Sequence, residues 1–326
     1  MNALSMVTGA NGHLGNTLVR ALLARGQHVR AGVRDPGAST ALSGLDCQVV
    51  RAELQDPDSL RQALQGVDVL YQVAAVFKHW ARNPQAEIVD VNVQGTRNVL
   101  RAAAEAGVRR VVYVSSVAAV GHNGQRLDEH TWNTDQQNPY YRSKILSERA
   151  AWETAQAYGL SMVAVLPSAI IGPHATRMTD TMGFLASVLA HKLVLDPHFY
   201  FNFVDVRDVA EGLIRAAEKG RPGQRYLLAN QQASSLAEVI EALNTLRPGY
   251  RVPRRAPKAL LLLIAWLQEL RARFTHQPAE LLLSQVQMSY GVHQVYCIDK
   301  AINELGYQPR SPQDALQQAF AHLLAR

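Results

Sequence analysis

The sequence predicts an α/β fold: a doubly wound parallel sheet with a smaller, mostly helical C-terminal substrate domain. In the first half of the 326 residues, short apolar runs alternate with helical patterns. Most of the short runs are β-branched and apolar almost throughout, as strands buried on both faces must be. Several helical patterns end at a glycine, where a left-handed C-cap belongs. Strict alternation of this kind indicates βαβ units and therefore a parallel sheet.

The first half contains six expected strands and four expected helices. The expected strands are Leu4–Thr8, His28–Val33, Gln48–Arg51, Val67–Val73, Arg110–Ser115 and Ser161–Leu166. The expected helices are Leu14–Ala24, Ser59–Leu64, Ala86–Ala106 and Tyr140–Ala157, and the glycines that end several of them are Gly26, Gly66, Gly107 and Gly159.

The second half is less regular. Asp205 and Asp208 flank the start of an expected helix that runs to about Lys219, and one more strand is expected over Arg225–Leu228. The later expectations are a helix to about Leu246 that begins at a capping box of Ser235 and Glu238, a Pro/Arg-rich stretch from Arg247 to Pro257, helices over Lys258–Phe274 and Pro278–Met288, a strand over Gln294–Ile298 and a final helix capped near Ser311.

Composition excludes several classes of protein. Apolar residues make up 48% of the chain, which excludes global disorder. The net charge is +6, but no run of five basic residues occurs, so we expect attraction for phosphates and no nucleic-acid partner. Two cysteines cannot form a disulfide framework, the histidines show no metal-binding spacing, and the longest apolar run, Ala259–Leu267, is too short to span a bilayer. We expect a cytoplasmic protein with no metal site and no stable membrane insertion.

A glycine-rich turn lies between the first expected strand and the first expected helix. Gly9, Gly12 and Gly15 are spaced by three residues. Glycines here allow a tight turn and let a pyrophosphate approach backbone N–H groups at a helix N-terminus. The motif predicts dinucleotide binding by a Rossmann-type domain. From the order of the elements we expect this domain over residues 1–170 plus 201–230, with a substrate-binding cap over 171–200 plus 231–326.

The end of the second expected strand indicates which dinucleotide binds. Arg34 follows this strand, 19 positions after Gly15, and Asp35 comes next. An acidic residue at this place holds the ribose 2′-hydroxyl of NAD, whereas an arginine suits the 2′-phosphate of NADP. Because Arg34 comes first, NADP(H) is expected as the preferred cofactor and NAD(H) as a possible one.

A serine pair and a Tyr-x-x-x-Lys motif could carry acid–base chemistry. Ser115 and Ser116 end an expected strand, where ligands meet an open α/β sheet. Tyr140 and Lys144 share one face of an expected helix. A neighbouring ammonium would lower the pKa of the tyrosine and make it a usable acid and base, while a serine hydroxyl could bind a carbonyl oxygen.

Together these motifs resemble the extended branch of the short-chain dehydrogenase/reductase superfamily, which includes the NAD-dependent epimerase/dehydratase family. The similarity is greatest to the dihydroflavonol-reductase-like group, with cinnamoyl-CoA reductases and hopanoid-associated sugar epimerases. It covers essentially the whole chain and includes Arg34-Asp35-Pro36, Val91-Asn92-Val93-Gln94-Gly95-Thr96, Leu166-Pro167-Ser168, Ile171-Gly172-Pro173, Phe203-Val204-Asp205-Val206-Arg207-Asp208-Val209-Ala210 and Glu304-Leu305-Gly306-Tyr307-Gln308-Pro309.

The resemblance implies a role for each matching residue. Ser116 corresponds to the catalytic serine, Tyr140 to the acid/base, and Lys144 to the residue that lowers the tyrosine pKa and holds the nicotinamide ribose; Tyr141 is assigned to packing. The implied cofactor-binding residues are Gly9, Asn11, Gly12, His13, Leu14, Gly15, Arg34, Glu53, Leu54, Val73, Ala74, Ala75, Tyr140, Lys144, Pro167, Ser168 and Ile170.

The function that these roles imply is NADP-dependent interconversion of a carbonyl and a hydroxyl group on a small molecule. An NDP-sugar epimerase or dehydratase with tightly bound NAD is the first alternative, and a non-catalytic NADP-binding sensor or scaffold is the second. The substrate stays open, and both a homodimer and a monomer are compatible with the resemblance. Segments expected to form the substrate pocket contain His79, Trp80, Trp132, His174, Phe184 and Phe199.

Overall fold

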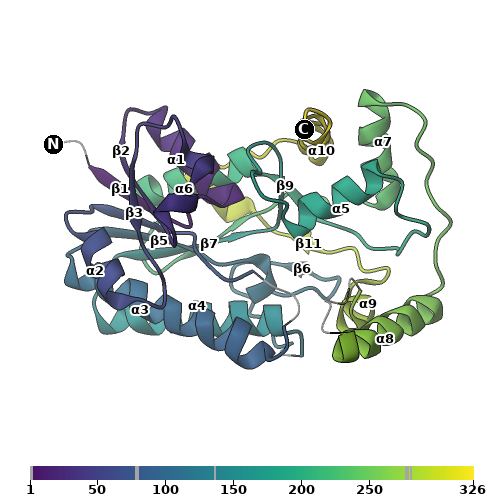
Figure 1. Ribbon diagram of the computed structural model, residues 1–326, viewed down its shortest axis with the longest axis horizontal. Helices are drawn as coiled ribbons and strands as arrows, with labels where there is room; N and C mark the ends of the chain where they lie inside the picture. Colours follow the sequence, from purple (N-terminus) through teal and green to yellow (C-terminus); the bar gives the residue numbers. More distant parts are fainter. Residues whose placement is uncertain (1–2, 78–80, 136, 276–278, 280) are drawn as a thin grey trace.

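The protein is built on a seven-stranded sheet in which every pair of neighbouring strands is parallel (Figure 1). The computed structural model describes residues 3–77, 81–135, 137–275, 279 and 281–326. The strand order is β10-β7-β5-β4-β1-β2-β3, the doubly wound order in which the chain starts in the middle and works outwards twice. The strands are β1 (Leu4–Thr8), β2 (His28–Val33), β3 (Gln48–Arg51), β4 (Val69–Gln72), β5 (Arg110–Val114), β7 (Met162–Pro167) and β10 (Arg225–Leu228).

Helices cover both faces of this sheet. On one face, α1 (His13–Leu23) packs beside α6 (Val206–Lys219). On the other face, α2 (Pro57–Leu64), α3 (Val91–Glu105) and α4 (Pro139–Ala157) lie side by side (Figure 1). The two faces bury separate apolar clusters, because each strand sends alternate side chains to opposite sides. The predicted fold class is therefore confirmed.

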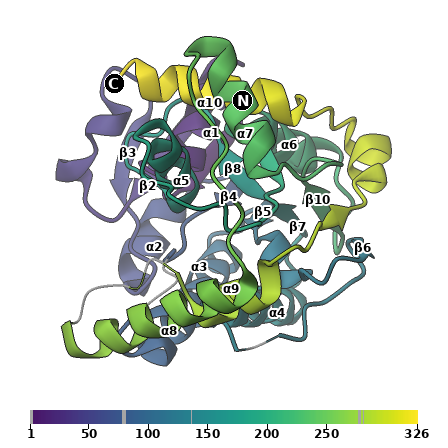
Figure 2. The same cartoon turned by 90° about the vertical axis from the view of Figure 1, so that its right-hand side faces the viewer.

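A mostly helical part lies beyond the carboxyl ends of the strands (Figure 2). Its first cluster combines α5 (Asp180–Leu189), α7 (Leu236–Leu246) and α10 (Pro312–Leu324). Its second cluster combines α8 (Lys258–Thr275) with α9 (Leu283–Ser289). Two short parallel pairs complete the structure: β8 (Ala169–Ile171) with β9 (Phe203–Asp205), and β6 (Arg126–Leu127) with β11 (Val295–Tyr296).

The predicted elements are present, with differences at several boundaries. Strands β1, β2, β3 and β10 have the predicted bounds. The long helix expected from Ala86 begins instead as a π-helical turn, Gln85–Asp90, before α3 starts. The helix expected from Pro278 begins at Leu283, and Pro278 itself lies outside the described residues. The capping box of Ser235 and Glu238 is confirmed, since each side chain bonds to the other residue's backbone N–H.

Gly15 fixes the distance between α1 and the glycine turn. A Cβ atom added at Gly15 would lie 2.2 Å from the backbone oxygen of Gly9. Backbone cannot yield in the way that a flexible side chain can, so a larger residue must push the helix away from the sheet. The third glycine of the motif is thus a requirement of packing as well as of ligand approach.

We predict that Gly15→Ala lowers the free energy of unfolding by about 1–3 kcal/mol, the usual cost of forcing extra atoms into a packed site. Gly183→Ala is the matched control. Gly183 lies inside α5, and an added Cβ would meet only the Met178 side chain at 3.6 Å. Alanine there should leave stability unchanged or raise it by about 0.5–1 kcal/mol. Urea unfolding of both variants measures the difference, and equal stabilities would contradict the packing argument.

Candidate active site at the carboxyl ends of the strands

The glycine turn leads directly into the first turn of α1. Gly9 adopts a left-handed φ of +64°, and its carbonyl accepts the N–H of Gly12 at 2.9 Å. Gly12 caps the helix without a side-chain hydrogen bond, and the first turn holds no acidic residue. The first N–H groups of a helix have no intrahelical partner and attract anions. This turn is therefore able to hold a pyrophosphate.

Two buried polar atoms among the predicted cofactor residues have no partner in the described part of the chain. They are Nδ1 of His13 and Oγ of Ser168. The other ring nitrogen of His13 lies 2.8 Å from the carbonyl oxygen of Pro173, and burial lowers the pKa of His13. Buried polar atoms are normally paired, so these two indicate room for a polar ligand. The residues present fit a dinucleotide.

Thr8 ties together the ends of the two central strands. Its hydroxyl donates to the Gln72 side chain at 2.7 Å and accepts the N–H groups of Val73 and Ala74 at 3.0 and 3.1 Å. Ala74 in turn lies against Gly9, whose missing Cβ would sit 3.0 Å from the Ala74 backbone. The predicted cleft residues Val73 and Ala74 are thus held directly beside the glycine turn, and Ala75, which follows them, is exposed.

Arg34 is the first residue beyond β2, and its side chain is 81% exposed. Its guanidinium lies 3.9 Å from the carboxylate of Glu53, the residue predicted to lie beside adenine. Asp35 is engaged differently, because its carboxylate accepts the N–H of Gly37 at 2.9 Å and caps a short turn. Leu54, next to Glu53, is buried against Gly95. At this strand end the Arg34 side chain is therefore open to solvent, while one oxygen of the Asp35 carboxylate is engaged in the local cap.

Ser116 and Tyr140 meet at the carboxyl end of β5. The hydroxyl of Tyr140 donates to Oγ of Ser116 at 3.4 Å, and Ser116 is buried at the start of a short turn. Asn138 starts α4 by accepting the N–H groups of Tyr140 and Tyr141. Lys144 follows Tyr140 by one turn of the same helix. The structure thus brings the three predicted catalytic residues to one edge of the sheet.

Burial dominates the ionisation of Tyr140 and Lys144. It raises the pKa of Tyr140 to about 12, although the contact with Ser116 acts in the opposite direction. It lowers the pKa of Lys144 to about 8, against the attraction of Glu148. The sequence argument predicts a lowered tyrosine pKa, but in this structure removal from water is the larger effect on the phenol. At neutral pH, Tyr140 therefore holds its proton and Lys144 is mostly charged.

The sequence analysis missed a buried ion pair next to the predicted catalytic residues. Glu148, one turn beyond Lys144, is fully buried and pairs with Arg225 of β10 at 2.7 Å. Its other oxygen accepts the hydroxyl of Ser115 at 2.6 Å. The placement of an acidic residue four positions after Lys144, on the same helix face, is the signal that could have indicated it.

Asn92 is a second positioning residue without a predicted role. Its side chain exchanges two hydrogen bonds with the backbone of Val76, at 2.7 and 2.9 Å, and donates to Ser143 Oγ at 2.9 Å. It thereby fastens the segment after β4 to the helix that carries Tyr140. A buried asparagine near the start of an amphipathic helix was the available signal.

The residues expected to line a substrate pocket do not form one cluster among the described residues. The guanidinium carbon of Arg225 lies 4.1 Å from the centre of the Trp132 ring. His174 Nδ1 lies 3.4 Å from the Thr17 hydroxyl. Phe184 and Phe199 each pack against Phe201. His79 and Trp80 lie outside the described residues.

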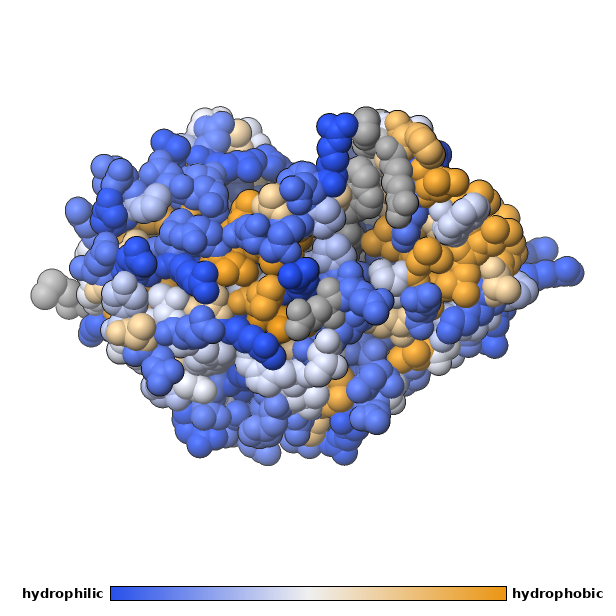
Figure 3. All heavy atoms as spheres, turned by 90° about the horizontal axis from the view of Figure 1, so that it is seen from below, coloured by the Kyte–Doolittle hydropathy of each residue, from blue (hydrophilic) through white to orange (hydrophobic). Residues whose placement is uncertain are grey.

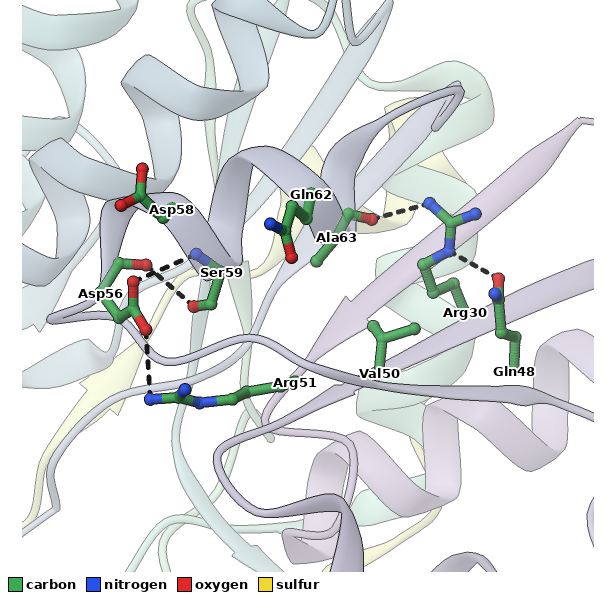
Figure 4. Close-up of a pocket in the computed structure, with 9 residues that line it drawn as sticks. All are labelled: Arg30, Gln48, Val50, Arg51, Asp56, Asp58, Ser59, Gln62 and Ala63. Atoms are coloured by element: carbon green, nitrogen blue, oxygen red, sulfur yellow. Dashed lines mark hydrogen bonds and ion pairs between the residues drawn. The ribbon is translucent and has the colours of Figure 1, made fainter.

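Figure 4 shows a hollow lined by residues of β2, β3 and α2 and of the loop between β3 and α2. Four of its polar side chains already bond one another: Arg51 pairs with Asp56 at 3.1 Å, and Arg30 bonds Gln48 at 2.8 Å. None of the predicted site residues lines it. We assign no ligand to this hollow.

We predict that Lys144→Met stabilises the protein at pH 7 by about 1–3 kcal/mol, because methionine removes a charge that burial disfavours. Since the folded-state pKa of Lys144 is lowered to about 8, the wild type gains stability as pH rises from 8 towards the unfolded value. The advantage of the variant should therefore shrink across that window. Urea unfolding at pH 7 and pH 10 tests this, with exposed Lys219→Met as control. A variant that is less stable than wild type at pH 7 would contradict it.

Comparison with known proteins agrees with this geometry. The sequence profile of the "NAD dependent epimerase/dehydratase family" matches residues 5–229. The sterol demethylase protein B of Methylococcus capsulatus is 38% identical over 267 residues, which are 79% of this chain and 80% of that protein. A Synechocystis protein provisionally named dihydroflavonol 4-reductase is 35% identical over 324 residues, 97% and 92% of the two chains. Cinnamoyl-CoA reductase 1 of Oryza sativa is 36% identical over 270 residues, 76% and 77% of the two chains.

Solved structures show the same fold. The crystal structure of gox2253 superposes with a TM-score of 0.85 at 31% identity and covers 99% of this chain and 98% of that one. A yeast methylglyoxal/isovaleraldehyde reductase in complex with NADPH superposes with a TM-score of 0.76 at 19% identity and covers 99% and 98%. The profile match and the relatives confirm the resemblance drawn from the motifs: this chain belongs to the NAD-dependent epimerase/dehydratase family, within the extended short-chain dehydrogenases/reductases.

Proposed function

We propose that the protein is an NADP-dependent oxidoreductase that interconverts a carbonyl and a hydroxyl group by hydride transfer. The observation that carries this proposal is the exposed Arg34 at the end of β2, with the neighbouring Asp35 engaged in a local cap. A guanidinium forms charge-assisted hydrogen bonds to phosphate, which NADP carries at its 2′ position and NAD lacks. Reductases of this kind draw on free NADPH, whereas epimerases return the hydride to a bound cofactor.

The protonation states at the strand end suit delivery of a proton to a carbonyl oxygen. Tyr140 holds its proton at neutral pH, and its hydroxyl points to Ser116. A substrate oxygen placed between these hydroxyls would accept a hydrogen bond from each, which stabilises charge as it develops. Lys144 adds a nearby positive charge that favours the phenolate left after proton transfer. The nicotinamide, when bound, supplies or accepts the hydride.

Two other functions compete with this proposal. The family name and the reductase names of two relatives both fit the chain, so an NDP-sugar epimerase or dehydratase with tightly bound NAD stays the first alternative. Arg34 counts against it, since an acidic residue suits NAD at that position. A non-catalytic sensor or scaffold is less supported, because it needs neither Tyr140 nor Lys144, and this chain has both.

The direct test is a screen of aldehydes, ketones and NDP-sugars with NADPH. The loss of NADPH absorbance measures the reaction. Consumption of NADPH with an aldehyde or ketone is the expected result. Conversion of an NDP-sugar without net change in the cofactor would support the epimerase alternative.

Tyr140→Phe should remove most turnover and leave cofactor binding nearly intact, because it deletes the transferable proton and little else. Acid–base groups contribute about 10²–10⁴-fold, so kcat should fall by at least that lower bound. Tyr141→Phe is the matched control, because Tyr141 lies beside Tyr140, with a ring-to-ring distance of 5.9 Å, and should cost little. Retention of more than about a tenth of the wild-type kcat would remove Tyr140 from its role.

Arg34→Ala should shift cofactor preference towards NADH. Loss of a charge-assisted contact costs roughly 1.5–3 kcal/mol with NADPH and nothing with NADH, so the ratio of the two kcat/KM values should move by about 10- to 150-fold. Arg51→Ala, an exposed arginine at the end of the adjacent strand, is the control. The NADP assignment is wrong if the wild type has the same kcat/KM with NADH as with NADPH. It is also wrong if the ratio of these two values is unchanged in Arg34→Ala.

A further inference from the structure

One face of α8 exposes an apolar stripe to solvent. Six of its large apolar side chains are exposed at helical spacing, and Leu263, Trp266 and Phe274 are 53%, 50% and 77% exposed. Figure 3 shows apolar side chains gathered over this corner of the molecule. Clusters of this kind are rare on the surface of proteins that act alone in water. The stripe consists of Leu260, Leu263, Trp266, Leu267, Leu270 and Phe274.

The opposite face of α8 is already packed. Leu261 and Ala265 are buried against Val286 of α9. Gln268 and Glu269, next along that side, accept the backbone N–H groups that precede and begin α9, at 2.9 and 2.8 Å. The orientation of the helix is therefore fixed by its contacts with α9, and within the described residues the stripe lies on the side of α8 away from those contacts.

Positive charge is concentrated in the segment of the chain that contains the stripe. Residues 247–275 contain seven basic side chains and one acidic side chain, Glu269, which faces α9. The whole chain has 33 basic and 27 acidic residues, so the rest of it has 26 of each. The net charge of +6 thus resides in this one segment of 29 residues. Arg254, Arg255 and Lys258 are exposed where the segment enters α8.

We propose that α8 docks the protein on an anionic lipid surface, with the apolar stripe in the interfacial layer and the basic residues against the headgroups. An amphipathic helix with these two features lies in the plane of a membrane and does not cross it. Among the described residues, no helix is both long and apolar enough to cross a bilayer. A second copy of the chain fits less well, because a symmetric contact would bring two segments of charge +6 together.

The docked helix would lie near the catalytic end of α4. The Ser284 hydroxyl of α9 lies 3.5 Å from the side chain of Asn138, which caps the helix carrying Tyr140. Helix α9 thus joins the lipid-facing element to the site. The docking proposal stands on α8 alone and does not depend on which reaction the site performs.

Sedimentation with lipid vesicles tests the proposal. The full chain should bind vesicles of phosphatidylcholine and phosphatidylglycerol (3:1) at least tenfold more than vesicles of phosphatidylcholine alone, and added salt should weaken binding. A Leu263→Ser, Trp266→Ser, Phe274→Ser variant should lose at least tenfold of that binding. An Arg254→Gln, Arg255→Gln, Lys258→Gln variant should lose the preference for anionic lipid. The control, Tyr158→Ser with Leu324→Ser, removes exposed apolar side chains elsewhere and should bind like wild type.

A measurement on near-wild-type protein covers the case in which the triple variant unfolds. Brominated lipid should quench Trp266 fluorescence, and Trp266→Phe should lose this quenching. Absence of binding to anionic vesicles at low salt, or equal loss in the control variant, overturns the proposal. So does a wild type that dimerises, fails to bind vesicles and becomes monomeric in the triple serine variant, because the stripe would then join two copies.

Discussion

A single buried carboxylate joins the end of β5 to α4, the helix that carries Tyr140 and Lys144. Glu148 belongs to the helix of Tyr140 and Lys144, and it bonds Ser115, the residue just before Ser116. Its charge is balanced by Arg225, whose other donors reach the carbonyl oxygens of Glu129 and Thr131 at 2.8 and 2.7 Å. A buried ion pair is costly unless all of its hydrogen bonds are made, and here both partners are well satisfied. The positions of the serine and the tyrosine depend on this network.

The same network explains why electrostatics at the site follow burial. The carboxylate nearest to Lys144 is already committed to Arg225, so it offsets only part of the cost of removing the ammonium from water. Tyr140 lies one helical turn further from Glu148 than Lys144 does, and burial is the largest influence on the pKa of Tyr140. Pairing rules read from sequence spacing identify which groups are neighbours, but the depth at which they lie sets the direction of each shift.

Local signals made most of the fold predictable. The bounds of β1, β2 and β3 follow from short apolar runs and from glycines that end the neighbouring helical patterns. Both signals depend on residues that are close together in the sequence. The pairing of β8 with β9 was missed, since both strands are three residues long and lie more than thirty positions apart. Glu148 and Arg225, 77 positions apart, were missed for the same reason. The positions of Gly15 and Tyr140 beside the strand ends could be predicted because their motifs are compact, whereas side-chain depth and the exposed face of α8 arise only from tertiary packing.

The chain leaves the main sheet at β7 and returns to it at β10, and this order ties the two parts of the molecule together. The outer helical cluster joins Ile171, from before the return, to Phe320, near the end of the chain. During synthesis, the apolar side chains of residues 171–189 are therefore not fully covered until α10 has been made. Recombination between the genes of two relatives at a single point between β8 and α10 would give a cluster whose two halves come from different proteins. A new substrate specificity could then be transferred only by moving both segments together, which favours change by point substitution.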